Sequence, residues 1–423
     1  MSQSAGAIIT SNFSFGHEDV FIPENLTSIL LNHQAVIEPE PPTPLLGDYV
    51  EIVFLSALFC AGLPINAFVL FRQSQAYYYR RVRMGCSDVD TGFLLQKLNL
   101  NVGNLLLLLS YCPVKVGWLI TYRWAACDAM CRIVHFLWAF AFHLSGYSVA
   151  SVALDRLRNV QSLSRMYARQ NFHGLGVDYV IPVRRFICAS WLGSLAFSLP
   201  QLYVFSLLKI VEGWSQCTTI WSIRHMHEKR PFEMLYVEEE IYLVVHLITV
   251  FWLPFILIIL SYIFIAAILL TRRSKGTGDC EKYAKRNARR RMWSRSKRGN
   301  EFNDLTDNQQ AMSISMANGS VTSHGSASQP MRGGWRRQYR SRMFRNTFLL
   351  ALAYCALWLP YNMFALLVFM GAQLAQILSD HVNWLKGLIM FNALINPFLY
   401  GWSTPELRKT SSRTILRGRS QTR

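Results

Sequence analysis

The sequence predicts an all-α membrane protein, a seven-transmembrane helix bundle with its N-terminus outside the cell. Three observations support this fold class. Hydrophobic residues make up 52% of the chain and charged residues only 16%, and the mean hydropathy is +0.19. A soluble protein carries about 25% charged residues. In addition, apolar stretches long enough to cross a bilayer recur along the 423 residues, and basic residues gather between alternate stretches.

Each apolar stretch is expected to be a helix. A span needs about 20 apolar residues, and lipid offers no hydrogen-bond partners to an unpaired backbone. The stretches that meet this length are 49–71, 94–119, 128–157, 185–207, 241–270, 345–371 and 382–402. The fifth contains no charged residue, whereas Lys115, Arg132 and Lys386 lie in the second, third and seventh.

The basic residues predict the topology, because Lys and Arg are concentrated in cytoplasmic loops. They cluster after the first, third, fifth and seventh spans, so these segments are expected to be cytoplasmic. Segment 1–48 is acidic and carries glycosylation sequons at Asn12 and Asn25, as expected outside the cell. The predicted divisions are an extracellular segment 1–48, spans one to five in 49–271, a third cytoplasmic loop 272–341, spans six and seven in 342–402, and a cytoplasmic tail 403–423.

The formal net charge is 43 − 25 = +18. In a soluble chain this excess would suggest nucleic acid as a partner. Here the basic run lies in loop 272–341, between two spans, where it is expected to contact anionic lipid and cytoplasmic proteins. No nucleic-acid partner is predicted. The middle of the loop is rich in Ser, Asn, Gly and Gln and is expected to be disordered. In the tail, Leu407, Ile415 and Leu416 alternate with basic residues, which predicts a short amphipathic helix on the membrane.

Short motifs occur in a fixed order along the spans. They are Asn66, Asn104, Cys131 followed by Asp155-Arg156, Pro200-Gln201, Pro254 with Tyr262, Trp358-Leu-Pro360-Tyr361, and Asn396-Pro397-Phe-Leu-Tyr400. Together these motifs resemble the rhodopsin-like (class A) G-protein-coupled receptors, from Tyr49 to Arg417. The resemblance implies a plasma-membrane receptor, not an enzyme, that needs no cofactor.

The resemblance also assigns roles to residues. It implies a disulfide between Cys131 and Cys217, although Cys127 remains an alternative partner. The residues expected to serve activation and coupling are Asp155, Arg156, Tyr262, Trp358, Pro360, Asn396, Pro397 and Tyr400. Buried polar residues inside spans usually face a partner, and the predicted interior network comprises Asn66, Asn104, Ser145, Asn392 and Asn396.

The ligand class is narrowed by individual positions. Amine receptors carry an Asp where this chain has Trp138, and opsins carry a Lys where it has Met390. Pro-Gln201-Leu-Tyr-Val-Phe, followed by Ser-Gln-Cys217-Thr, resembles the gonadotropin-releasing hormone and adipokinetic hormone receptors. Asn104, where most of the class has Asp, also occurs in that group. The resemblance therefore implies a divergent, invertebrate-type receptor for a peptide hormone or neuropeptide, with a heterotrimeric G protein, of Gq type, as its partner.

Two alternatives remain open at this stage: a class A receptor for an unrelated, for example vasopressin-like, peptide, and a membrane transporter. By resemblance, the ligand would contact Lys115, Trp138, Gln201, Tyr361, Asn362 and Lys386. Lys115 and Lys386 could instead extend to the membrane surface. No spacing of Cys and His predicts a metal site, and His135 and His143 are expected to be hydrogen-bonded interior residues.

Overall fold

The computed structural model describes residues 46–169, 178–211, 214–227, 232–271, 342–369 and 382–401. The sequons at Asn12 and Asn25, the basic loop 272–341 and the tail 403–423 lie outside these ranges, so the predictions made for them stay predictions.

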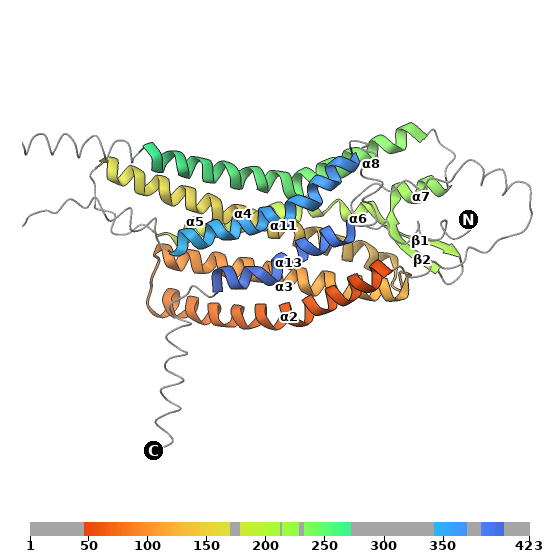
Figure 1. Cartoon of the computed structure of the whole chain (residues 1–423), viewed down its shortest axis with the longest axis horizontal. Helices are drawn as coiled ribbons and strands as arrows, with labels where there is room; N and C mark the ends of the chain where they lie inside the picture. Colours follow the sequence, from red (N-terminus) through yellow and green to blue (C-terminus); the bar gives the residue numbers. More distant parts are fainter. Residues whose placement is uncertain are drawn as a thin grey trace, which may run out of the picture.

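The described chain is a bundle of long helices that run along one axis (Figure 1). In chain order its elements are α2 (Leu46–Tyr77), the π-helix η1 (Tyr78–Arg83), α3 (Val89–Thr121), α4 (Asp128–Arg169), α5 (Val180–Ser198), α6 (Gln201–Val204), β1 (Phe205–Val211), β2 (Trp214–Thr219), α7 (Ile220–His227), α8 (Phe232–Leu247), the π-helix η2 (Ile248–Trp252), a helical segment 253–271, α11 (Arg342–Phe369) and α13 (Val382–Gly401). Among the described residues, six helices are long and apolar enough to cross a membrane, and the apolar part of α13, Leu385–Tyr400, is shorter.

Helix α4 is the centre of the bundle. Its most apolar window is 78% buried, against 22% for the corresponding windows of α2, of Val180–Val204 and of Val237–Thr271. It packs against α3, α5, α6, α11, β1 and η2, while α2 packs between α3 and α13. The poorly buried helices therefore face lipid, and α4 connects the two ends of the molecule.

A close approach in the middle of the bundle explains Gly146. Pro254 has no N–H group, so the carbonyl of Val250 loses its helical donor, and the π-helix η2 lies just before this proline. A Cβ at Gly146 would lie 3.2 Å from that carbonyl oxygen and 2.8 Å from the hydroxyl of Tyr354. Only glycine allows α4 to approach η2 and α11 this closely.

The fourth predicted span was wrong at its C-terminal end. It was expected to continue as helix to residue 207, but the helix turns at Leu199 and Pro200, α6 ends at Val204, and the chain enters β1. Strands β1 and β2 form an antiparallel hairpin in which Leu207 pairs with Cys217. The hairpin and α7 lie at one end of the bundle (Figure 1), which we call the hairpin end. The apolar residues of β1 are buried by this pairing rather than by lipid.

At the opposite end, two aspartates fasten the segments that connect the helices. Asp88 caps α3 by accepting a hydrogen bond from the Thr91 N–H at 2.9 Å. Asp178 accepts from the Ser87 hydroxyl and from the Val180 N–H, and pairs with Arg81. The Ser87 hydroxyl, followed by the backbone N–H groups of α5 and Arg81, holds the pKa of Asp178 below its ordinary value. Asp178 is therefore an anion at neutral pH that joins the start of α5 to the segment before α3.

Candidate functional site

A cluster of buried polar residues surrounds Arg156, towards the end of the bundle opposite the hairpin. Its guanidinium Nη2 lies 2.7 Å from the Asp155 carboxylate, and both side chains are buried. Asp155 also accepts from Asn159 at 3.0 Å and pairs with Arg158 at 3.5 Å. The predicted resting pair between Asp155 and Arg156 is thus present in this conformation.

A second contact holds Arg156, and the sequence did not predict it. The guanidinium carbon lies 4.9 Å from the centre of the Phe93 ring in α3, and the ammonium of Lys97 lies 4.6 Å from the same centre. Lys97 is only 4% exposed. One aromatic ring therefore contacts two buried cations, each of which gains a cation–π attraction while the two repel one another.

Tyr262, one of the residues assigned to activation and coupling, lies near this cluster. Its hydroxyl is within electrostatic range of Arg156, and its ring packs edge-on against Phe348 at 5.4 Å. Tyr262 and α11 are therefore adjacent to Arg156 in this conformation.

The interior network predicted from the asparagines is largely formed. Asn104 donates to the Asn66 side chain at 3.3 Å and to the Tyr400 hydroxyl at 3.4 Å, and it accepts from Asn396 at 3.2 Å. Asn66 also donates to the carbonyl of Ala393 at 3.1 Å. These bonds join α2, α3 and α13 at the point where Pro397 interrupts the bonding of α13.

Ser145 and Asn392 are also buried, at 5% and 1% exposure. No hydrogen bond between described residues joins either side chain to the asparagines. Their membership of the network stays a prediction.

Trp358 lies in the middle of the bundle, next to the proline that interrupts α11, Pro360. Its indole is 1% exposed and lies 5.9 Å from the ring of Phe142, 5.0 Å from that of Tyr354 and 6.5 Å from that of Phe251. Rings from α4, η2 and α11 thus meet at Trp358. Because the interior is closely packed, a shift of one of these helices must displace the rings of the others.

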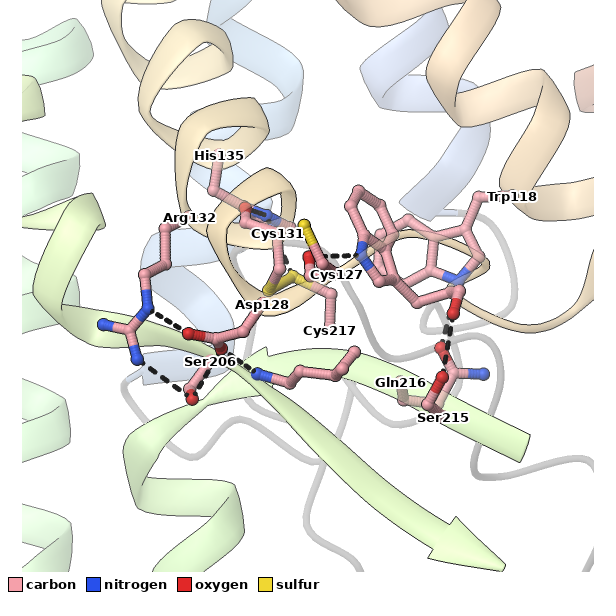
Figure 2. Close-up of a disulfide and its surroundings, with 12 residues drawn as sticks. Trp118, Cys127, Asp128, Cys131, Arg132, His135, Ser206, Ser215, Gln216 and Cys217 are labelled. Carbon is pink, nitrogen blue, oxygen red and sulfur yellow. Dashed lines mark hydrogen bonds and ion pairs between the residues drawn. A yellow bond between two sulfur atoms is a disulfide. The ribbon is translucent and has the colours of Figure 1, made fainter. Parts of the chain in front are cut away.

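A disulfide and the hydrogen bonds of Asp128, which we call the Asp128 clamp, hold the hairpin end to α4. Cys131 is bonded to Cys217, with 5.6 Å between their Cα atoms, which confirms the predicted pairing. Cys127, the alternative, is an exposed free thiol. Beside the disulfide, Asp128 accepts from Arg132 at 2.7 Å, from the Ser206 hydroxyl at 2.9 Å and from the Leu207 N–H at 2.7 Å (Figure 2).

The candidate ligand residues at this end border a cluster of aromatic rings. Trp138 donates to the Ser110 carbonyl at 2.8 Å, and its ring lies 4.9 Å from Tyr111 and 6.4 Å from Trp118. Trp118 donates to Gln216 of β2 at 3.0 Å (Figure 2). The hairpin is thereby attached directly to the aromatic cluster.

Lys115 and Lys386 lie over rings of this part of the molecule, 5.6 Å from Trp118 and 5.9 Å from Tyr361 respectively. Both lysines are buried, at 8% and 9% exposure. They lie against aromatic faces inside the bundle, and the alternative that they extend to the membrane surface is wrong.

Two candidates lie apart from this group. Gln201 is fully buried and lies 3.5 Å from His246, next to Tyr242. Asn362 donates to the Trp358 carbonyl of its own helix at 2.7 Å. The structure therefore brings together Lys115 and Trp138, and separately Tyr361 and Lys386, while Gln201 and Asn362 have their own surroundings.

The interior histidines behave as predicted. His135 bonds to the Cys131 carbonyl at 3.0 Å, and His143 bonds to the Ala139 carbonyl at 2.7 Å and to Thr249 at 3.2 Å. Cys131, His135 and Cys217 place three possible metal-ligand atoms within 4.8 Å of one another. Both sulfurs are consumed by the disulfide, however, and only a thiolate ligates zinc.

Several residues of these sites were not predicted from the sequence. Asp128 and Arg132 carried a signal, because an acid four residues before a base at a helix start predicts a helix-end ion pair. Phe93, Lys97 and Trp118 carried none. Their importance depends on contacts with residues that lie far away in the sequence.

Comparison with known proteins agrees with this architecture. Residues 93–400 match the family described as "7 transmembrane receptor (rhodopsin family)". The chain is 30% identical over 430 aligned residues to the G-protein coupled receptor daf-38 of Caenorhabditis elegans, covering 93% of this chain and 99% of that protein.

Two hormone receptors are also similar. The gonadotropin-releasing hormone receptor of Octopus vulgaris is 24% identical over 72% of this chain and 61% of its own length, and the pig (Sus scrofa) vasopressin V2 receptor is 29% identical over 43% of this chain and 46% of its own length. The chain belongs to the rhodopsin family of seven-transmembrane receptors, class A of the G-protein-coupled receptors, and it is a multi-pass plasma-membrane receptor rather than an enzyme or a transporter.

Proposed function

We propose that this receptor binds a peptide hormone or neuropeptide of the gonadotropin-releasing or adipokinetic type at its hairpin end and activates a heterotrimeric G protein, of Gq type, at its Arg156 end. The similarity to receptors named for gonadotropin-releasing hormone supports the ligand class. The observation that carries the proposal is the direct attachment of the β1–β2 hairpin, through Gln216, to the aromatic rings beneath it. A peptide that contacts both would stabilise one arrangement of the helices over another.

Calcium release in cells that express the receptor with a promiscuous G protein tests this function. The panel comprises amidated gonadotropin-releasing, adipokinetic and vasopressin-like peptides. A response to the first two types supports the proposal, and Arg156→Ala should abolish it at unchanged surface expression. Arg165→Ala, an exposed arginine on the same helix, is the matched control and should leave the response intact.

A vasopressin-like ligand is the second candidate, favoured by the similarity to the vasopressin V2 receptor. The same panel distinguishes the two ligand classes. A response to vasopressin-like peptides alone would identify the ligand as vasopressin-like and contradict the gonadotropin-releasing or adipokinetic type. Silence of a well-expressed receptor towards every peptide would contradict both.

Basal signalling should depend on Phe93. Phe93→Leu removes the ring that contacts the Arg156 guanidinium, a cation–π attraction worth up to about 2 kcal/mol when buried. Arg156 then keeps its ion pair with Asp155 but loses its aromatic contact, and ligand-free nucleotide exchange is expected to rise several-fold. Phe93→Trp keeps an aromatic face and should stay close to wild type. Equal basal exchange in Phe93→Leu and wild type, at matched surface expression, would contradict this role.

Sodium should have little effect on agonist binding. Class A receptors commonly hold sodium at the span-two aspartate, which is Asn104 here. Its partners Asn66, Asn396 and Tyr400 are also neutral, and a cation is bound poorly without a carboxylate. Replacing sodium chloride by potassium chloride at equal ionic strength should leave the agonist Kd unchanged. A several-fold shift that is specific to sodium would show that another site holds the ion.

A further inference from the structure

Lys115 is a buried cation without a counter-ion in the described part of the chain. It sits in α3 one turn after Tyr111, and its side chain is 8% exposed. No hydrogen bond or ion pair to another described residue satisfies its ammonium, and its close contact is the face of Trp118, 5.6 Å away. A buried charge without a hydrogen-bonded partner of opposite sign is strongly unfavourable.

The surroundings of Lys115 are aromatic rather than acidic. Trp118 lies 6.4 Å from Trp138, and Trp138 lies 4.9 Å from Tyr111. Tyr111 is in turn within electrostatic range of Tyr361, the ring beneath the second buried ammonium, Lys386. The rings of Trp118, Trp138 and Tyr111 therefore form a continuous aromatic surface beside Lys115. Such a surface attracts cations through its faces but gives them no hydrogen-bond acceptor.

Two buried acids of α2 lie at this end of the bundle, and no ion pair of the described residues joins either of them to Lys115. Asp48 accepts a hydrogen bond from the Tyr122 hydroxyl. Glu51 of α2 is 8% exposed and lies within electrostatic range of Tyr111. It makes no ion pair with a described residue, and its Oε2 atom is buried without a hydrogen-bond partner there. His135, which is within electrostatic range of Lys115, is bonded to the Cys131 carbonyl and supplies no negative charge.

We propose that the natural ligand carries a carboxylate and that Lys115 binds it, with the apolar or aromatic body of the ligand on Trp118, Trp138 and Tyr111. The proposal rests on the proposed function, whose ligand-binding end it specifies. A single ammonium without an acidic partner matches one negative charge, which favours a carboxylate over a doubly charged phosphate. In a peptide, the group would be an Asp or Glu side chain or a free C-terminus.

A thermal-shift titration of the purified full-length receptor in lipid nanodiscs tests this site without a G protein. The probe is indole-3-acetate, compared with its neutral isostere indole-3-acetamide. Wild type should bind the acid about tenfold more tightly than the amide, since a hydrogen bond to a charged group contributes about that factor. Lys115→Met should abolish the difference, Lys115→Arg should retain it, and Lys209→Met, an exposed lysine of β1, should leave it unchanged.

Glu51→Gln supplies an opposing test. It removes a buried negative charge that would repel a bound carboxylate, so the preference for the acid over the amide should increase. Equal binding of the two probes by wild type, an equal loss in Lys209→Met, or a reduced preference in Glu51→Gln would each overturn the proposal. Lys115→Met replaces a buried charge by an apolar chain of similar length and is expected to fold. A melting temperature equal to that of wild type, measured without probe, checks that the variant is folded.

The calcium assay separates this proposal from the proposed function. Each peptide of the panel is presented both as its C-terminal amide and as its free acid. A response to amidated peptides that is identical in wild type and Lys115→Met would leave the function intact and overturn the carboxylate site. A preserved acid preference in nanodiscs, with no response to any peptide, would support the site and contradict the peptide function.

Discussion

Cys217→Ser is expected to lower the stability of the receptor by about 2–5 kcal/mol, the usual effect of losing a native disulfide, and to abolish ligand binding. The bond closes a loop of sequence separation 86 between α4 and β2. Once it is broken, the hairpin keeps only noncovalent contacts, among them the hydrogen bonds of Asp128 and the stacking of Phe205 on His135. Surface expression and the melting temperature of the purified receptor measure the loss.

Cys127→Ser is the matched control, because Cys127 precedes Cys131 by one helical turn and is an exposed free thiol. It should match wild type in both measurements. An equal loss in Cys127→Ser would mean that Cys127, not Cys131, pairs with Cys217. Adding Asp128→Ala to Cys217→Ser should reduce stability further, because the disulfide and the Asp128 hydrogen bonds hold the same hairpin to α4.

Asn104→Leu is the second change with a large expected effect. Leu has a similar volume but leaves the Asn66 side-chain oxygen and the Asn396 amide without the bonds that Asn104 now makes. Each buried polar group left unsatisfied costs about 1–3 kcal/mol. The melting temperature of the ligand-free receptor is expected to fall by several degrees, since about 1 kcal/mol moves the melting temperature of a large domain by about 2–4 °C.

Ser145→Ala serves as the control for this loss. The Ser145 hydroxyl is buried, but no hydrogen bond to a described residue joins it to the asparagines, so its removal should change the melting temperature little. A loss as large as that of Asn104→Leu would place Ser145 in the network after all. An unchanged melting temperature in Asn104→Leu would show that the network does not contribute to stability.

These two changes act at different points of the same route through the molecule. The disulfide and the Asp128 clamp fix the hairpin to the start of α4, and α4 carries Arg156 near its other end. The asparagine network joins α2, α3 and α13 beside Pro397. The hairpin and Arg156 are therefore joined through one helix, α4, and its packed neighbours.

Hydropathy and charge along the sequence were sufficient to determine the membrane class and the approximate spans. Each of these is a property of local composition, because lipid demands about 20 apolar residues and internally bonded helices. The family, and with it Cys131 with Cys217 and Asp155 with Arg156, came from the resemblance that the ordered motifs carry, and the polar residues inside the spans pointed to the asparagine network. The hydropathy pattern failed at residues 205–207, where an apolar run pairs as β1 instead of continuing the helix.

Only the tertiary structure decided which polar side chains share a partner. Phe93 and Arg156 meet because α3 and α4 pack side by side, and Lys115 is buried because Trp118 and the hairpin close over that part of α3. The sequence marked Lys115 as a charge inside a span but did not mark Lys97, since the free energy of a charge depends on its depth and neighbours, not on its position in the chain. Composition determined that helices cross the membrane; packing decided which charges they bury.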